Sequence, residues 1–339
     1  MEQNLSQIAQ KLVSDGKGIL AADESTATIK KRFDQISVVS SNDSRRDYRE
    51  MLFSTMDAMN DFISGVILFD ETIRQNCRDG RKITDLLKET DTLIGIKVDT
   101  GAKNLALFDN ETITEGLDGL RERLIEYHSL GATFAKWRAV IRITKNTPTN
   151  YSLASNAHAL SRYAALCQEV GVVPIVEPEV LMDSHDSNHT IEQCFDITSK
   201  TLSLVFDELI NANVALDGII LKPNMIIPGI NCTEKVPPIE VAKQTLKCLE
   251  ECVPNDVPGI CFLSGGQSDI EATKHLSLMN EIKVTNIKLS FSYGRALQQS
   301  ALLKWKGNDE NILEAQNAFK HRAKMNSLAS LGKWQEDLE

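Results

Sequence analysis

Eight short runs of strand-forming residues recur along the chain, and segments with apolar residues at helical spacing separate them. The segments 117–132 and 155–171 show this spacing, and a glycine lies at or near the end of each. Strict alternation of strands and helices is typical of a parallel sheet. The pattern predicts an α/β fold, a (β/α)8 TIM barrel with a C-terminal helical extension. The expected strands are 18–23, 63–70, 94–99, 134–140, 173–180, 217–223, 259–265 and 286–294.

The alternative for such a pattern is a doubly wound open sheet. That fold more often carries a G-x-G-x-x-G turn after its first strand, and this sequence has none. No low-complexity segment or change in composition marks a linker, so residues 1–339 are expected to form a single domain. Strands would span about 18–294, helices 295–330, and a short tail 331–339.

Charge and composition limit the classes of partner. The net charge of −10 argues against nucleic acid and against an anionic membrane surface. No stretch approaches the ~18 apolar residues of a membrane span, and the polar start reads as a capped surface helix rather than a signal peptide. Seven cysteines without a C-x-x-C pair fit the reduced thiols of a cytoplasmic protein.

Polar residues mark the ends of the expected strands. Lys222 ends the apolar run 217–223, where burying an unpaired ammonium would cost several kcal/mol. Strand ends meet at one face of a barrel, and side chains two apart share a face. A single charge there is more often structural, but two lysines, an arginine and three carboxylates together indicate a site. The residues concerned are Asp23, Lys136, Arg138, Glu177, Glu179, Lys222, Ser264, Ser290, Ser292 and Gly294.

This set of residues suits a Schiff-base enzyme. A lysine with a pKa near 10.4 is about 3.4 units too basic to attack a carbonyl at neutral pH, roughly 4.6 kcal/mol. Desolvation and a second cation lower that pKa, and the apolar strand of Lys222 and nearby Lys136 would supply both. The carboxylates would then move protons during carbinolamine formation and dehydration.

Two glycine turns indicate a phosphorylated substrate. Gly265 and Gly266 follow the seventh expected strand, Gly294 and Arg295 follow the eighth, and each turn leads into a helix. Backbone amides at a helix N-terminus, together with a guanidinium, form a phosphate cradle. The loops after strands seven and eight are the usual place for it in this barrel.

With these residues in place, the sequence resembles class I, Schiff-base fructose-bisphosphate aldolases. The similar strings include "GILAADEST", "FAKWRAV", "VPIVEPEV", "LKPNM", "FLSGGQS" and "FSYGRALQ", and they extend over nearly the whole chain. The resemblance implies a glycolytic carbon–carbon lyase without metal or cofactor. It would cleave fructose 1,6-bisphosphate reversibly to dihydroxyacetone phosphate and glyceraldehyde 3-phosphate. The family's usual tetramer implies a homo-oligomer whose other partners are small sugar phosphates.

The resemblance also implies a role for each motif residue. Lys222 would form the Schiff base, Glu177 would exchange the protons of its formation, and Glu179 would tune Glu177. Asp23 would take the hydroxyl proton whose loss breaks the carbon–carbon bond, while Lys136 and Arg138 hold the intermediate. The phosphate next to the ketone would meet Ser264, Gly265, Gly266, Ser292, Gly294 and Arg295. The far phosphate would meet Ser25, Thr28 and Arg32.

The sequence departs from the animal members of this family at three places. Thr100 replaces a lysine on the phosphate side, with Lys103 as a candidate substitute, and Ala27 replaces a common glycine. The chain lacks the long tail whose terminal tyrosine assists proton transfer. A pocket group such as Glu177 is therefore expected to protonate the enamine, and the last residues are expected to carry little structure.

Three other functions fit part of the sequence. A metal-dependent aldolase could use His185 and His189, but their segment reads as a solvated polar loop. A transaldolase-like enzyme is disfavoured by the two expected phosphate sites. A scaffold protein would be expected to have lost Lys222, Glu177 or Asp23. Cys248 and Cys252, one helical turn apart, are expected to be ordinary thiols on a helix.

Overall fold

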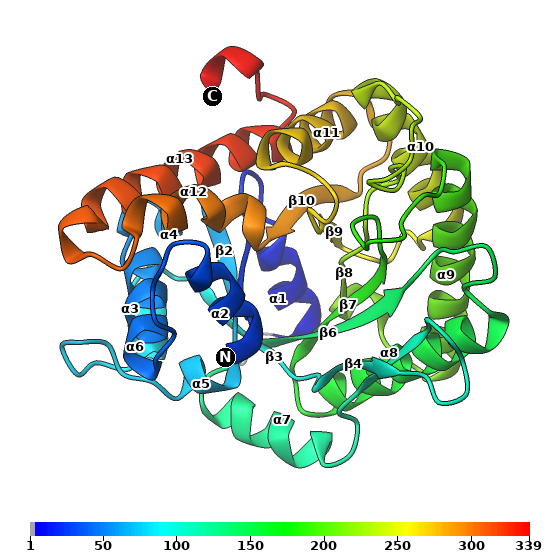
Figure 1. Ribbon diagram of the computed structural model, residues 1–339. Helices are drawn as coiled ribbons and strands as arrows, with labels where there is room; N and C mark the ends of the chain where they lie inside the picture. Colours follow the sequence, from blue (N-terminus) through cyan, green and yellow to red (C-terminus); the bar gives the residue numbers. More distant parts are fainter. Residues whose placement is uncertain (1–3) are drawn as a thin grey trace.

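The computed structural model describes residues 4–339 and contains a closed barrel of eight parallel strands. Going round the barrel, the strands follow one another in chain order, and β10 pairs with β1 to close it. Helices surround the strands (Figure 1). The predicted (β/α)8 barrel is confirmed. Its strands are β1 Gly18–Ala22, β2 Ile63–Leu68, β3 Leu93–Lys97, β6 Phe134–Ile141, β7 Val173–Val180, β8 Ile220–Leu221, β9 Gly259–Phe262 and β10 Lys288–Tyr293.

Side-chain caps fix where several of the surrounding helices begin. Thr149, Thr190 and Ser268 each accept a hydrogen bond from a backbone N–H in the first turn of the following helix. The helices are α1 Leu5–Leu12, α2 Thr26–Asp34, α3 Asn42–Phe53, α4 Met56–Phe62, α5 Asp70–Ile73, α6 Ile83–Lys88, α7 Leu120–Ser129, α8 Asn150–Glu169, α9 Ile191–Asn211, α10 Pro238–Cys252, α11 Asp269–Ile282, α12 Arg295–Trp305 and α13 Ile312–Ser330.

Two segments differ from the predicted elements. Only two residues of the expected strand 217–223 pair as β8, because Leu216–Gly218 form a 3-10 turn in which Gly218 packs closely against Leu5 of α1. An antiparallel hairpin, β4 Gly101–Asn104 and β5 Thr112–Glu115, was not predicted, since its polar sequence shows no run of strand formers.

Apolar side chains fill the half of the barrel at the N-terminal ends of the strands, and α1 covers this end. Ile8 and Leu12 of α1 pack on the inward side chains of the strands, among them Phe134 and Ile175. Gly95 is required here, because a Cβ at this position would lie 2.2 Å from the Phe134 ring. The inner space available for polar side chains is therefore at the C-terminal ends of the strands.

The C-terminal region contains the expected helices, but the tail after them is not loose. Trp334 is buried, and its Nε1 donates to Glu339 Oε1 at 2.9 Å. The other oxygen of Glu339 pairs with buried Arg322 of α13. The expectation of a tail with little structure was therefore wrong, although the end of the chain lies at the edge of the molecule, beyond α11 (Figure 1).

No helix within residues 4–339 is both long enough and apolar enough to span a membrane.

Candidate active site

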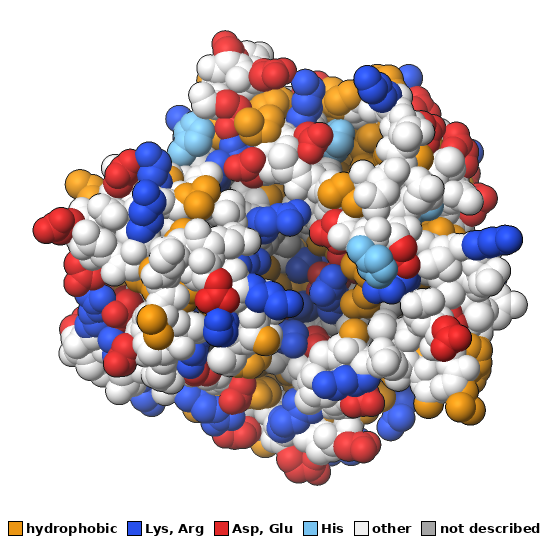
Figure 2. Space-filling model, in the orientation of Figure 1, with side chains coloured by type: hydrophobic (Ala, Val, Ile, Leu, Met, Phe, Trp, Pro, Cys, Tyr) orange, Lys and Arg blue, Asp and Glu red, His pale blue; other side chains and the backbone are white. Residues whose placement is uncertain are grey.

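A cavity of about 700 Å³ opens where the barrel strands end. Figure 2 shows Lys and Arg side chains gathered around a hollow at the centre of this face. Of the residues expected in the site, all but Gly266 and Ser290 line the cavity. Ser290, which shares a face of β10 with Ser292, lies at the other end of the strand and donates to the Lys17 carbonyl.

A cluster of buried charges lies at the bottom of the cavity. Lys222 Nζ is 3.1 Å from Glu177 Oε1, and Lys136 Nζ is 3.3 Å from Glu177 Oε2. Lys136 also lies 2.7 Å from Asp23 Oδ2. Glu177 thus lies between two lysine side chains, and because all three groups are buried, the interactions between them are weakly screened by water.

The lysines determine the ionisation of the two carboxylates. Burial opposes the charge of Asp23, but Lys136 and Lys222 outweigh it and lower its pKa to about 2. Burial likewise opposes the charge of Glu177, and the same lysines still hold its pKa below the ordinary value. Burial would lower the pKa of Lys136, yet Asp23 and Glu177 together raise it. Asp23 is therefore a carboxylate and Lys136 an ammonium at neutral pH.

Strand register places a second ion pair above this cluster. Arg138 of β6 lies opposite Glu177 of β7, and its Nε donates to Glu179, two residues further along β7. A Cβ on Gly265 would lie 3.1 Å from Glu179 Oε1, so a glycine lets the loop after β9 pass close to this carboxylate.

The turn after β10 has the features of an anion cradle. The Ser292 hydroxyl is buried and has no hydrogen-bond partner within residues 4–339, which leaves it available to a ligand in the cavity. A Cβ on Gly294 would lie 3.3 Å from the Ala21 carbonyl and 3.6 Å from Arg32 Nη2. Arg295 opens α12 and lines the same wall.

Gly266 does not line the cavity but shapes the neighbouring loop from behind. Its φ is +72°, and a Cβ would lie 2.8 Å from that of Met182.

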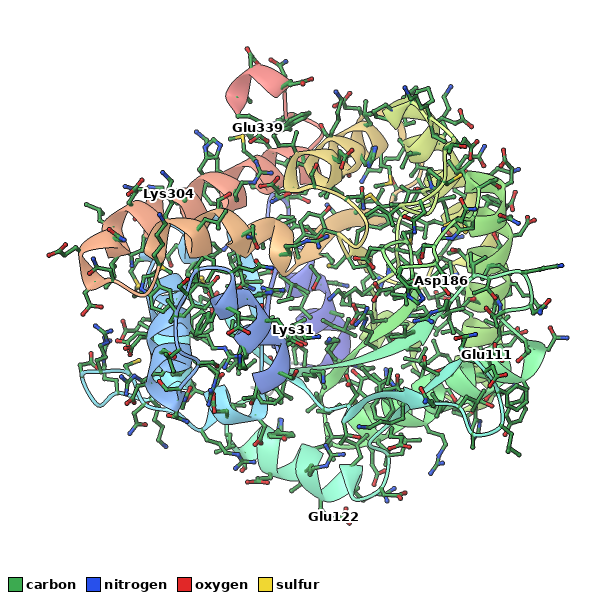
Figure 3. All side chains as sticks on the ribbon, viewed as in Figure 1. Lys31, Glu111, Glu122, Asp186, Lys304 and Glu339 are labelled. Carbon is green, nitrogen blue, oxygen red and sulfur yellow. The ribbon has the colours of Figure 1, made fainter. Side chains whose placement is uncertain are left out.

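Helix α2 forms the outer wall of the mouth. Ser25 caps the helix by accepting from the Thr28 N–H at 3.3 Å, and the two hydroxyls lie 3.0 Å apart. Arg32, one turn later, extends along the cavity. Figure 3 shows Lys31 of the same helix near the centre of this face.

The comparisons with known proteins agree with this geometry. The model of the family "Fructose-bisphosphate aldolase class-I" matches residues 4–339. A fructose-bisphosphate aldolase of Dictyostelium discoideum is 50% identical over 96% of this chain and 91% of its own. The chain belongs to the class I fructose-bisphosphate aldolase family.

Other relatives agree with the assignment to the aldolase family. Cytosolic fructose-bisphosphate aldolase 4 of Arabidopsis thaliana is 49% identical over 96% of this chain and 82% of its own. The solved aldolase of Plasmodium falciparum, in complex with TRAP and a small-molecule inhibitor, superposes with a TM-score of 0.95. The two sequences are 47% identical, and the match covers 98% of this chain and 95% of the Plasmodium chain. Class I aldolases are lyases that cleave fructose 1,6-bisphosphate through a lysine Schiff base, and this chain is an enzyme of that class.

Lys97 and Asp99 are among the residues of the aldolase cavity that were missed in the sequence. Lys97, the last residue of β3, and Asp99 line the cavity, with 2.9 Å between Lys97 Nζ and Asp99 Oδ1. The same strand-end rule that identified the other residues could have found this pair in "IGIKVD". Thr100 and the exposed Lys103 do not line the cavity, so Lys97 supplies a cation at this strand end whatever residue stands at 100.

The histidine pair weighed as a metal site is not assembled in this aldolase. Within residues 4–339, no three metal-ligating side chains gather at one point. His185 is exposed, whereas His189 is buried because its loop folds back, with the Gly229 N–H donating to the His189 carbonyl at 2.9 Å. The segment is a loop as predicted, but His189 is not solvated.

Proposed function

We propose that Lys222 is the Schiff-base lysine of this aldolase and attacks the ketone carbon of fructose 1,6-bisphosphate. The observation that carries the proposal is its contact with Glu177, 3.1 Å away at the buried end of a cavity lined by cationic groups. Glu177 can accept a proton from the attacking amine and return one to the departing hydroxyl. The resulting iminium withdraws the electron pair left when the carbon–carbon bond breaks.

Asp23 is the base that starts cleavage in this scheme. Its carboxylate is ionised at neutral pH and can take the proton of the hydroxyl beyond the breaking bond. Lys136 holds Asp23 in place and offers its remaining hydrogens to substrate hydroxyls. Arg138 and Glu179 line the adjacent part of the cavity. Glu177 is also the proposed source of the proton that converts the enamine to dihydroxyacetone phosphate.

The two phosphates would lie on opposite sides of this centre. Backbone N–H groups of the glycine turns and the Arg295 guanidinium suit the phosphate next to the ketone. Ser25, Thr28 and Arg32 suit the far phosphate. The turns concerned contain Ser264, Gly265, Gly266, Ser292 and Gly294, with Gly266 acting through the loop conformation.

Borohydride reduction in the presence of dihydroxyacetone phosphate is expected to attach a three-carbon phosphate to Lys222 and to inactivate the enzyme. Peptide mass mapping identifies the modified lysine. Chelators should leave activity unchanged. An adduct on a different lysine, or activity lost to a chelator and restored by zinc, would contradict the proposal.

Arg295→Ala is expected to raise KM by about tenfold to a hundredfold, the scale of one charge-assisted phosphate contact, with a small change in kcat. Lys304→Ala is the matched control, because Lys304 lies on the same helix but pairs with Glu314 at 2.6 Å on the outer surface (Figure 3). Steady-state kinetics with the bisphosphate and with fructose 1-phosphate measure both. If Arg295→Ala leaves both KM values unchanged, the turn after β10 does not bind phosphate.

We also propose that the chain is one barrel domain that forms a homo-tetramer in the cytoplasm. The usual tetrameric assembly of the family supports the homo-tetramer. The cytosolic name of the Arabidopsis relative supports the location in the cytoplasm. Light scattering coupled to size-exclusion chromatography tests the tetramer: the mass of a monomer would contradict it.

A further inference from the structure

Lys222 lies where the regular pairing between β7 and β8 ends. Strand β7 has eight residues, but within residues 4–339 β8 pairs with it at two positions only. The Lys222 N–H still donates to the Val176 carbonyl of β7 at 2.8 Å. In the described chain, no strand residue follows between Pro223 and the start of α10, so the backbone ladder stops beside the lysine.

The edge of β7 that faces β8 keeps one backbone group in need of another partner. The Leu181 N–H donates to the Ile141 carbonyl of β6 at 2.8 Å, so odd-numbered residues of β7 turn their N–H groups toward β6. Even-numbered residues turn theirs toward β8, because the backbone groups of successive residues point to opposite sides of a strand. On that side Pro178 has no N–H, and the N–H of buried Val180 lies beyond the last residue of β8.

The side chain of Asn224 takes the place of the missing strand residue. Its Oδ1 accepts from the Val180 N–H at 3.0 Å. Its Nδ2 donates to the Met225 carbonyl and to Thr198 Oγ1 of α9, both at 3.1 Å. Asn224 is 1% exposed, so water does not compete for these bonds. A side-chain amide thus continues the β7–β8 ladder where the backbone cannot.

The segment that carries the lysine is therefore attached to β7 at two points. Along β7, the backbone bond of Lys222 lies before Glu177, and the bond of Asn224 lies after it. Lys222 Nζ and Glu177 Oε1 are 3.1 Å apart between these two attachments. The second attachment prevents the segment from turning about the first, which keeps the amine within hydrogen-bond distance of the carboxylate.

We propose that Asn224 is a positioning residue that holds Lys222 against Glu177 for formation of the Schiff base, through its bond to the Val180 N–H. The inference rests on the role proposed for Lys222. Asn224 does not line the cavity, so it acts through the backbone of the lysine and not on the substrate. Its loss should slow attack on the ketone, because a misplacement of reacting groups by about 1 Å can cost ~10²-fold in rate.

The test measures how fast the imine with dihydroxyacetone phosphate forms, by quenching with borohydride at successive times and weighing the Lys222 adduct. Asn224→Ala is expected to lower this rate about tenfold to a hundredfold. Asn224→Leu fills the space without a hydrogen-bonding group, so it should show the same loss even if the alanine variant folds poorly. The inhibition constant of mannitol 1,6-bisphosphate, which has no carbonyl, should stay within about twofold in both variants.

Asn224→Asp is the conservative variant. A carboxyl group buried at this position is expected to take up a proton. It then keeps an acceptor for the Val180 N–H and a donor for the Met225 carbonyl, so imine formation should stay within about threefold of the unmodified rate. A loss as large as that of Asn224→Ala would show that the bond to Val180 is not the cause, and would overturn the inference.

Asn326→Ala is the matched control for loss of a buried asparagine. Asn326 of α13 is fully buried; its Oδ1 accepts from Thr273 Oγ1 and its Nδ2 donates to the Arg322 carbonyl, both at 2.9 Å. Its replacement should lower Tm and leave the rate of imine formation unchanged. An equal loss of rate in this control would show that general loosening is responsible.

Two further results would overturn the role of Asn224. One is an unchanged rate of imine formation in both Asn224→Ala and Asn224→Leu. The other is a rise in the inhibition constant of mannitol 1,6-bisphosphate as large as the loss of rate, since the phosphate contacts would then be disturbed as well. An adduct on a lysine other than Lys222 in the unmodified enzyme is a different outcome, because it would contradict the proposed Schiff-base lysine itself.

Discussion

Lys222→Met is expected to lower the turnover of fructose 1,6-bisphosphate by at least ~10⁴-fold, the scale for loss of a covalent nucleophile. Without an imine, the electron pair of the breaking bond has no comparable acceptor among the groups lining the cavity. Binding should persist, since the proposed phosphate contacts come from other residues. Isothermal titration with the bisphosphate should therefore still show saturation.

The control for this variant is Lys17→Met. Lys17 immediately precedes β1 at the opposite end of the barrel, where its Nζ donates to the Asn60 carbonyl at 2.6 Å. It should keep full turnover. If Lys222→Met retained more than about a hundredth of the activity, another lysine would form the Schiff base, and the mechanism proposed for Lys222 would be wrong.

Asp23→Asn is expected to lower turnover by at least ~10²-fold, the usual scale for removing a proton-transfer group. The amide is nearly isosteric but cannot accept the hydroxyl proton, so the reaction should stop after the Schiff base has formed. Borohydride should then trap an adduct of six carbons and two phosphates on Lys222, whereas the unmodified enzyme gives the three-carbon adduct. Mass mapping distinguishes the two adducts, because their masses differ by one triose phosphate.

Asp70→Asn provides the comparison for Asp23→Asn. Asp70 also follows a barrel strand, β2, but it accepts from the Tyr127 hydroxyl at 2.9 Å and does not line the cavity. Its amide variant should give only the three-carbon adduct at normal turnover. Failure of Asp23→Asn to form any adduct would place Asp23 before cleavage, contrary to its proposed role.

Residues at strand ends were predictable because geometry constrains them strongly. Parallel strands in a closed barrel end at one face, so alternation along each strand was enough to bring Lys136, Glu177 and Lys222 together. The same reasoning applied to β3 would have given Lys97 and Asp99.

Features that depend on distant contacts were not predictable. The hairpin β4–β5 is held by bonds to β6, in which Thr112 and Thr114 hydroxyls donate to the carbonyls of Val140 and Arg138 at 2.9 and 2.6 Å. Strand β8 follows a 3-10 turn in which Gly218 packs against Leu5 of α1, and Trp334 in the tail donates a hydrogen bond to Glu339. Local composition indicates none of these partners.

Helix α1 closes one end of the barrel, and this closure determines the order in which substrates and products pass through the mouth of the cavity. Apolar side chains fill the barrel beneath Lys222, so in the described part of the chain the substrate must arrive, and both products must depart, through the same mouth. Thr28, in the far-phosphate group, is exposed at the rim, whereas Lys222 is buried. Under the mechanism proposed for Lys222, the triose nearer the rim has to leave before the one still bonded to this lysine. In the direction of synthesis, the ketone must enter first, and an aldehyde that enters too early would block its path.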